Sequence, residues 1–235
     1  MKAAYTGWTW LTAKDAETAK KQLEQSFKEC KFLGYDYVEN FAFIGDYFED
    51  PNELIEMEKR CGVELVNLYG HFGTDVEENI AVGKKQIDFL AAIGGKWYNC
   101  QHGGYFGDGG PLERPTNPEV LDKICAIADT LGAYAKEKGV TLCFHPHYGT
   151  CVFWESDIDY LMAHTDPRYV SFCIDTAHTT LAGMSPVELI KKVGPPPCVY
   201  APQRRRHLRF EDRRGCRQNR AHSARSAMAP STSLL

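Results

Sequence analysis

The first 195 residues alternate between two patterns of apolar and polar positions. Short apolar runs, of the kind that buried strands show, begin near six residues: Ala3, Asp36, Val63, Lys96, Val140 and Tyr169. Between these runs apolar residues recur at helical spacing, as two stretches illustrate: Ala16, Ala19, Leu23, Phe27, Cys30 and Leu33, and Leu121, Ile124, Ala128, Leu131 and Ala135. The pattern predicts six strand–helix units in succession.

Helix boundary signals agree with these units. Asp50 and Ser185 each precede a proline at the first predicted helical position, and a glutamate follows that proline two residues later. Four glycines stand where a helix would end before the next strand: Gly34, Gly62, Gly94 and Gly139. Because a strand, a helix and the next parallel strand take about thirty residues, we expect the α/β class. The predicted architecture is a TIM-type (β/α)8 barrel, incomplete here with about six βα units.

The pattern stops after Lys192, where the composition also changes. Residues 1–195 hold 15 Lys and 3 Arg against 29 acidic residues, a net charge of −11. Residues 196–235 hold nine Arg, no Lys and two acidic residues, a net charge of +7, and they show no apolar periodicity. Low hydrophobicity with like charge predicts disorder. We therefore expect a truncated barrel over residues 1–200 and an Arg-rich disordered tail over residues 201–235.

Two explanations of the tail stay open. The abrupt change from Lys to Arg near Pro195 is typical of a GC-rich gene read out of frame, which predicts that the barrel is truncated and its activity impaired or lost. The other explanation is a basic tail that binds nucleic acid or an acidic partner, in a protein that is not an enzyme. The connection from His102 to Pro118, rich in Gly and Pro, is either a functional loop or a flexible surface loop.

Histidines and a carboxylate follow the fifth and sixth predicted strands. His145 and His147 are two residues apart, so both can point to the same side of a strand end. Asp175 closes the next strand and His178 follows it. Since parallel barrels place their chemistry at the carboxyl ends of neighbouring strands, these groups should converge. One carboxylate with two or three imidazoles suits Mn²⁺, Co²⁺, Fe²⁺ or Zn²⁺ better than Ca²⁺ or Mg²⁺. The alternative is that the histidines only hydrogen-bond the loop backbone.

Other strand ends add polar and aromatic candidates. Trp8 follows the first strand, Glu39 the second, His71 the third and His102 the fourth. Together they would ring one barrel mouth, as a pocket for a polyol or sugar requires.

Three segments carry a family resemblance. They are GVTLCFHPHYGT (139–150), DIDYLMAHTDP (157–167) and CIDTAH (173–178). With them, about residues 3–200 resemble the sugar phosphate isomerase/epimerase superfamily, the xylose isomerase-like TIM barrels, and within it the inosose (2-keto-myo-inositol) dehydratase-like members. The first and third of these segments, taken in order, are moderately specific for the superfamily and only weakly specific for the substrate.

The resemblance implies a site as well as a fold. Asp175 matches a family metal ligand, and His145 stands where most members have a glutamate, so both are expected to bind a divalent metal. The third and fourth family ligands have no counterpart before the pattern stops. Mn²⁺ or Co²⁺ is the expected ion, with Zn²⁺, Fe²⁺ and Mg²⁺ as alternatives. His147, His178 and Glu39 are expected to be catalytic, and Trp8, His71 and His102 to bind substrate.

The implied chemistry is proton abstraction next to a carbonyl, in carbohydrate metabolism. A lyase would then expel a β-hydroxyl from a sugar or inositol derivative. A ketose epimerase or sugar phosphate isomerase would instead return the proton. A third possibility, an endonuclease of the related barrel group, needs a basic face, which a body of net charge −11 disfavours.

The composition of the chain bears on its expected location and partners. Apolar residues make up 43 % of the chain and charged residues 25 %, which is ordinary for a globular protein. No apolar run approaches the roughly 20 residues that span a bilayer, and the N-terminus shows no apolar signal segment. The nine cysteines include no C-x-x-C pair. We expect a cytoplasmic protein with neither membrane nor nucleic acid as its partner, and leave open whether it forms a homo-oligomer.

Overall fold

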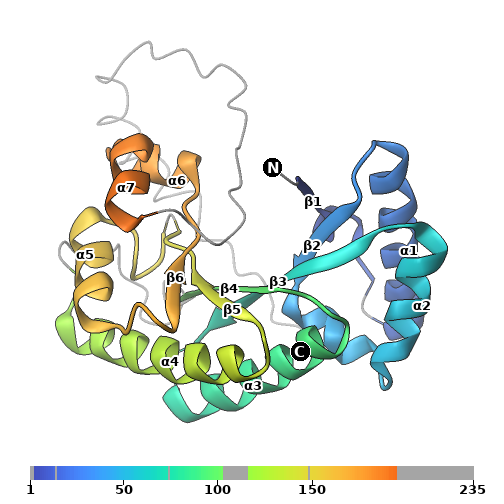
Figure 1. Ribbon diagram of the computed structural model, residues 1–235, viewed down its shortest axis with the longest axis horizontal. Coiled ribbons are helices and arrows are strands. Elements are labelled where there is room, and N and C mark those ends of the chain that lie inside the picture. The colour runs from blue at the N-terminus through green and yellow to red at the C-terminus, as the bar shows by residue number, and fades with distance from the viewer. Residues whose placement is uncertain (1–2, 14, 74, 103–115, 148, 195–235) are drawn as a thin grey trace, which may run out of the picture. The chain divides into compact units, whose positions relative to one another are not determined.

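Six parallel strands form one sheet in the order β1-β2-β3-β4-β5-β6 (Figure 1). The computed structural model describes residues 3–13, 15–73, 75–102, 116–147 and 149–194. The strands are β1 (Ala4–Thr6), β2 (Tyr37–Phe41), β3 (Glu64–Phe72), β4 (Trp97–His102), β5 (Thr141–Phe144) and β6 (Val170–Phe172). Each begins within one residue of the start that its apolar run predicts. Within the described ranges, β1 pairs with β2 alone and β6 with β5 alone.

At least one helix follows each described strand, as the apolar periodicity predicts. They are α1 (Ala16–Phe32), α2 (Pro51–Cys61), α3 (Val76–Ala92), α4 (Pro118–Glu137), α5 (Glu155–His164), α6 (Thr176–Leu181) and α7 (Pro186–Val193), with 3₁₀ turns η1 (Gly7–Trp10) and η2 (Ala42–Tyr47). Asp50 caps α2 by accepting the Asn52 N–H, and Gly62 ends it at φ 70°. This left-handed conformation is one that glycine adopts without strain. None of the described helices is both long and apolar enough to cross a membrane.

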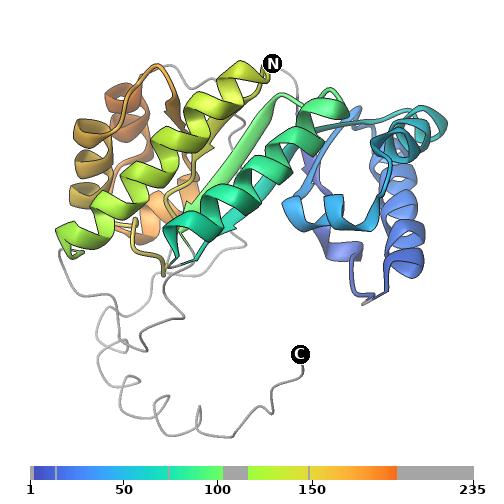
Figure 2. The same cartoon turned by 90° about the horizontal axis from the view of Figure 1, so that it is seen from below.

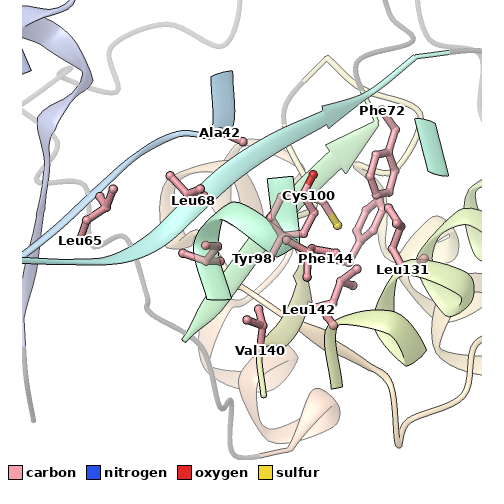
Figure 3. Packing of buried hydrophobic residues seen from close by; sticks show 14 of the residues in the cluster. Ala42, Leu65, Leu68, Phe72, Tyr98, Cys100, Leu131, Val140, Leu142 and Phe144 are labelled. Carbon is pink, nitrogen blue, oxygen red and sulfur yellow. The ribbon is translucent and has the colours of Figure 1, made fainter. Parts of the chain in front are cut away.

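One face of the sheet packs against helices and forms the core. Two long helices, α3 and α4, contact each other and lie side by side along the sheet (Figure 2). Figure 3 shows alternate residues of three neighbouring strands in this core, near Leu131 of α4: Leu68, Phe72, Tyr98, Cys100, Leu142 and Phe144. Because side chains alternate along a strand, the intervening residues lie on the opposite face. There they are largely polar, and they form the floor of the site described below.

Some sequence-based predictions fall outside the described residues. The Gly- and Pro-rich connection lies almost entirely within residues 103–115, and the Arg-rich tail, for which a change of reading frame is one explanation, lies within residues 195–235. The disorder of residues 201–235 and the two-part division of the chain therefore stay predictions.

A buried carboxyl group of α2 should make stability depend on pH. Glu58 is 8 % exposed, its Oε1 accepts the Leu65 N–H of β3 at 2.6 Å, and burial raises its pKa to about 7. The folded chain thus holds the Glu58 proton more tightly than the unfolded chain, whose pKa is 4.5. The stability that this proton contributes is complete below pH 4.5 and is lost as pH rises through 7. The difference amounts to about 3 kcal/mol.

We expect Glu58→Gln to match the wild type in stability near pH 4.5 and to exceed it progressively up to pH 8. The glutamine amide stays neutral, and its oxygen can still accept the Leu65 N–H. Urea unfolding at several pH values measures the difference. Glu56→Gln is the matched control, because Glu56 lies in the same helix but is exposed and bonded to Lys59. A stability difference between Glu58→Gln and wild type that does not change with pH would contradict the prediction.

Candidate active site

A cavity of about 180 Å³ opens at the carboxyl ends of the strands. Every strand or the turn that follows it contributes to the wall, as expected of a barrel mouth. The lining residues are Thr6, Trp8, Glu39, Asn40, Phe41, Tyr69, Asn99, His145, His147, Cys173, Asp175 and His178. Six of the eight residues that the sequence singles out are therefore brought together here.

Three histidines form a tight group in this cavity. Ligand nitrogens of His145, His147 and His178 all lie within 4.8 Å of one another. Ring centroids are 5.5 Å apart for His145 and His147, and 3.9 Å apart for His147 and His178. The backbone explains the position of His147: its N–H donates to the Val152 carbonyl, and its own carbonyl accepts the Thr150 N–H and hydroxyl. A short turn thus holds His147 beside its neighbours.

His145 is held in one orientation and one tautomer. Its backbone N–H donates to the Cys100 carbonyl at 2.7 Å, which extends the sheet by one residue beyond β5. Its Nδ1 lies 3.2 Å from the Cys173 carbonyl oxygen. Since a carbonyl oxygen only accepts, Nδ1 carries the proton and Nε2 is left with a lone pair. Burial, with His147 and His178 nearby, lowers the pKa of His145 to about 3, so the ring is neutral.

His178 has an unused nitrogen, and Asp175 is its neighbour. Within the described ranges the Nδ1 of His178 is buried without a hydrogen-bond partner, and burial lowers the pKa of this ring. Asp175, 2 % exposed, caps α6: its Oδ1 accepts the N–H groups of Ala177 and His178. Its Oδ2 lies 3.8 Å from Nε2 of His178. The sequence pairs His145 with Asp175 as metal ligands, whereas the structure groups His145 with the two other imidazoles.

Glu39 belongs to a chain of hydrogen bonds across the floor of the cavity. The Thr6 hydroxyl donates to its Oε1 at 2.6 Å, and Nδ2 of Asn67 donates to its Oε2 at 2.8 Å. Oδ1 of Asn67 accepts the backbone N–H of Asn99, and Nδ2 of Asn99 approaches the Cys173 sulfur at 3.6 Å. Both carboxylate oxygens of Glu39 are thus oriented by neighbouring strands. A fixed carboxylate in a cavity suits a general base.

Aromatic rings form one wall of the mouth. Trp8 lies in the turn after β1 and is 47 % exposed, with its ring 5.7 Å from that of Phe41. His71 packs against the rings of Phe41 and Tyr69, at 5.6 and 5.1 Å, but is not among the lining residues. An aromatic wall beside polar groups suits the alternating apolar and hydroxyl-bearing surfaces of a sugar or polyol.

The structure does not bring His102 to the cavity. His102 is the last residue of β4 and is 5 % exposed, but it shares the helix-covered face with Tyr98 and Cys100. The cavity face of β4 is formed by the alternate residues, Asn99 and Gln101, and Gln101 accepts the Tyr69 hydroxyl. Sequence reasoning chose the final residue of the strand and overlooked Asn99. The alternation of polar residues within Trp97–His102 was the available signal.

The chain is similar in sequence to one protein family and to curated relatives. A family model described as "Xylose isomerase-like TIM barrel" matches residues 27–224. An inosose dehydratase of Bacillus cereus (strain AH820) is 30 % identical over a 188-residue alignment that covers 74 % of this chain and 60 % of that protein. The chain thus spans about three fifths of the length of the curated relatives it matches.

Solved structures show the same fold. A structure of L-ribulose 3-epimerase aligns with a TM-score of 0.63 at 13 % identity, covering 77 % of this chain and 63 % of that one. An IOLI protein with a bound zinc atom aligns with a TM-score of 0.58 at 16 % identity, covering 79 % of this chain and 66 % of that one. At such identities the likeness shows the fold alone.

Proposed function

This chain belongs to the xylose isomerase-like TIM barrel family, and on that premise we propose that its cavity binds a small sugar or inositol derivative and removes a proton next to a carbonyl group. The leading candidate is an inosose dehydratase-like lyase, which the 30 % identical relative supports. The single observation that carries the proposal is the group of three imidazoles within 4.8 Å, in the same cavity as Glu39.

The three imidazoles fit a divalent metal. His145 is neutral with its Nε2 lone pair unprotonated, and His178 has a buried Nδ1 without a partner. Metal-binding histidines usually donate their other N–H to a carbonyl or carboxylate, as His145 donates to Cys173. Imidazole ligands suit Zn²⁺, Mn²⁺, Co²⁺ and Fe²⁺. When bound, such an ion acts as a Lewis acid toward a carbonyl or hydroxyl oxygen. We assign His145, His147 and His178 as its ligands, with Asp175 beside His178.

Glu39 is the proposed base. Its carboxylate, oriented by Thr6 and Asn67, takes the proton from the carbon next to the substrate carbonyl. In a dehydration, the β carbon–oxygen bond then breaks and the leaving hydroxyl takes that proton, which releases water. Trp8 and Phe41 offer aromatic surface to the apolar side of the substrate ring.

A second candidate is a ketose epimerase of the same fold, which the likeness to L-ribulose 3-epimerase supports. The first proton transfer is identical, but the proton returns to carbon on the opposite face and no water is lost. Incubation with 2-keto-myo-inositol and, separately, with ketohexoses in the presence of Mn²⁺ or Co²⁺ distinguishes the two. Water loss from the inosose supports the lyase, and C3 epimerisation supports the epimerase. If no form of the chain yields either product, both candidate functions are overturned.

The proposed change of reading frame predicts a difference between two forms of the chain. We expect the chain as printed to turn over little or no substrate and a frame-restored form to be active. The physical reason is that β1 and β6 each have one strand partner within the described residues, whereas a barrel closes only when every strand has two. Parallel assays of both forms measure the difference. Equal activity would show that the Arg-rich segment is a working part of the enzyme.

A further inference from the structure

Asn99 presents an unused hydrogen-bonding atom to the cavity. The residue lies in the middle of β4, its side chain is among those that line the cavity, and it is 4 % exposed. Its Oδ1 is buried and has no hydrogen-bond partner among the residues that the structure describes. Leaving a buried polar atom unpaired costs about 1–3 kcal/mol, so such atoms are rare unless a ligand uses them.

The neighbouring polar groups are already engaged. Asn67 donates to Glu39 and accepts the backbone N–H of Asn99. Gln101, two residues along the same strand, accepts the Tyr69 hydroxyl at 2.5 Å. Among the described residues that line the cavity, two amides each keep one buried atom without a hydrogen-bond partner: Asn99 its Oδ1 and Asn40 its Nδ2. Asn99 is the one of these two that belongs to the hydrogen-bonded floor around Glu39.

Either orientation of the Asn99 amide leaves one atom available to a ligand. As placed, Nδ2 of Asn99 approaches the Cys173 sulfur at 3.6 Å and Oδ1 is free to accept. A thiol is a weak hydrogen-bond donor as well as a weak acceptor. If the amide were turned over, Oδ1 would accept from the Cys173 thiol and Nδ2 would be free to donate. A hydroxyl group both donates and accepts, so it is the ligand group that matches both orientations.

We infer that Asn99 is a specificity-determining residue that hydrogen-bonds one hydroxyl of the substrate, an inference that rests on the proposed function. The position lies between Glu39 on β2 and the imidazoles after β5 and β6, so a polyol whose carbonyl faces the imidazoles places a ring hydroxyl on β4. A site that hydrogen-bonds a hydroxyl discriminates against the deoxy analogue, because the buried amide is then left unpaired. The expected substrate is therefore a polyhydroxylated ring that keeps the hydroxyl facing Asn99.

Calorimetric titration of the full chain tests the inference. The probes are 2-keto-myo-inositol and its analogues that each lack one hydroxyl, with Mn²⁺ held constant. We expect wild type to bind the parent compound about tenfold more tightly than one of the analogues. Asn99→Leu, which is nearly isosteric and leaves the backbone bond to Asn67 intact, should bind the parent about tenfold more weakly and lose that preference. Asn99→Ala, which cannot clash, should behave like Asn99→Leu.

Two controls separate a binding role from a structural one. Both Asn99 variants should retain wild-type Mn²⁺ affinity, and Asn52→Leu, an exposed change in α2, should bind all probes as wild type does. If Asn99→Leu and Asn99→Ala keep the discrimination, or weaken all probes by one common factor, the subsite is wrong while the proposed function stands. If neither the printed chain nor its frame-restored form binds any of the probes, the proposed function and the subsite are both overturned.

Discussion

Replacing His145 with alanine should reduce the affinity for Mn²⁺ or Co²⁺ at least about 100-fold, since altering even an outer partner of a metal ligand costs 10–100-fold. His145 is the most buried of the three imidazoles, and the Cys173 carbonyl fixes the tautomer that leaves Nε2 unprotonated. The loss should appear in titration calorimetry of the chain as printed, because the cavity and its three histidines lie within the described residues.

A matched control exists elsewhere in the chain. His164 ends α5, is exposed, hydrogen-bonds the Tyr160 carbonyl at 2.8 Å and lies outside the histidine group. His164→Ala should leave metal affinity unchanged. Equal metal affinity in His145→Ala and wild type would show that the three imidazoles are not the metal site.

Replacing Glu39 with glutamine should lower kcat about 10²- to 10⁴-fold in the frame-restored chain, the range that a general base contributes. The amide cannot take the substrate proton, although it occupies the same space between Thr6 and Asn67. Metal affinity should stay within about threefold of wild type, because the proposed ligands are the three imidazoles and Glu39 is not a ligand. Steady-state kinetics and metal titration on the same preparation measure both quantities.

Glu119→Gln is the control for this change. Glu119 lies in the first turn of α4 and is exposed, so its replacement should alter neither kcat nor metal affinity. If Glu39→Gln retains full turnover, another group removes the proton and the assignment of Glu39 is wrong.

The fold was largely predictable because two local signals agreed. Apolar runs marked all six strands, and helical spacing with caps such as Asp50 and glycines such as Gly62 marked the helix ends. Six parallel strands in chain order then followed from the short helical connections. Such signals depend on the backbone and on burial, which a single sequence records well.

The site was only partly predictable, because the face of the sheet on which a side chain lies depends on the register of its strand. His145 and His147 were found because they lie two residues apart at a strand end. In Trp97–His102 the same period places Asn99 and Gln101 in the barrel interior and His102 against the helices. Choosing the final residue of the strand therefore selected the wrong face for a cavity. The unpaired Oδ1 of Asn99, within the described residues, depends on contacts between distant strands, which no local pattern records.

His145, His147 and His178 are proposed to hold a divalent metal together, beside Glu39. The most direct measurement is anomalous diffraction from crystals of this chain soaked with Co²⁺. We expect one strong peak inside the cavity, about 2.0–2.2 Å from a nitrogen of each of the three imidazoles. A cavity without a peak, or a peak held by other residues, would contradict the account.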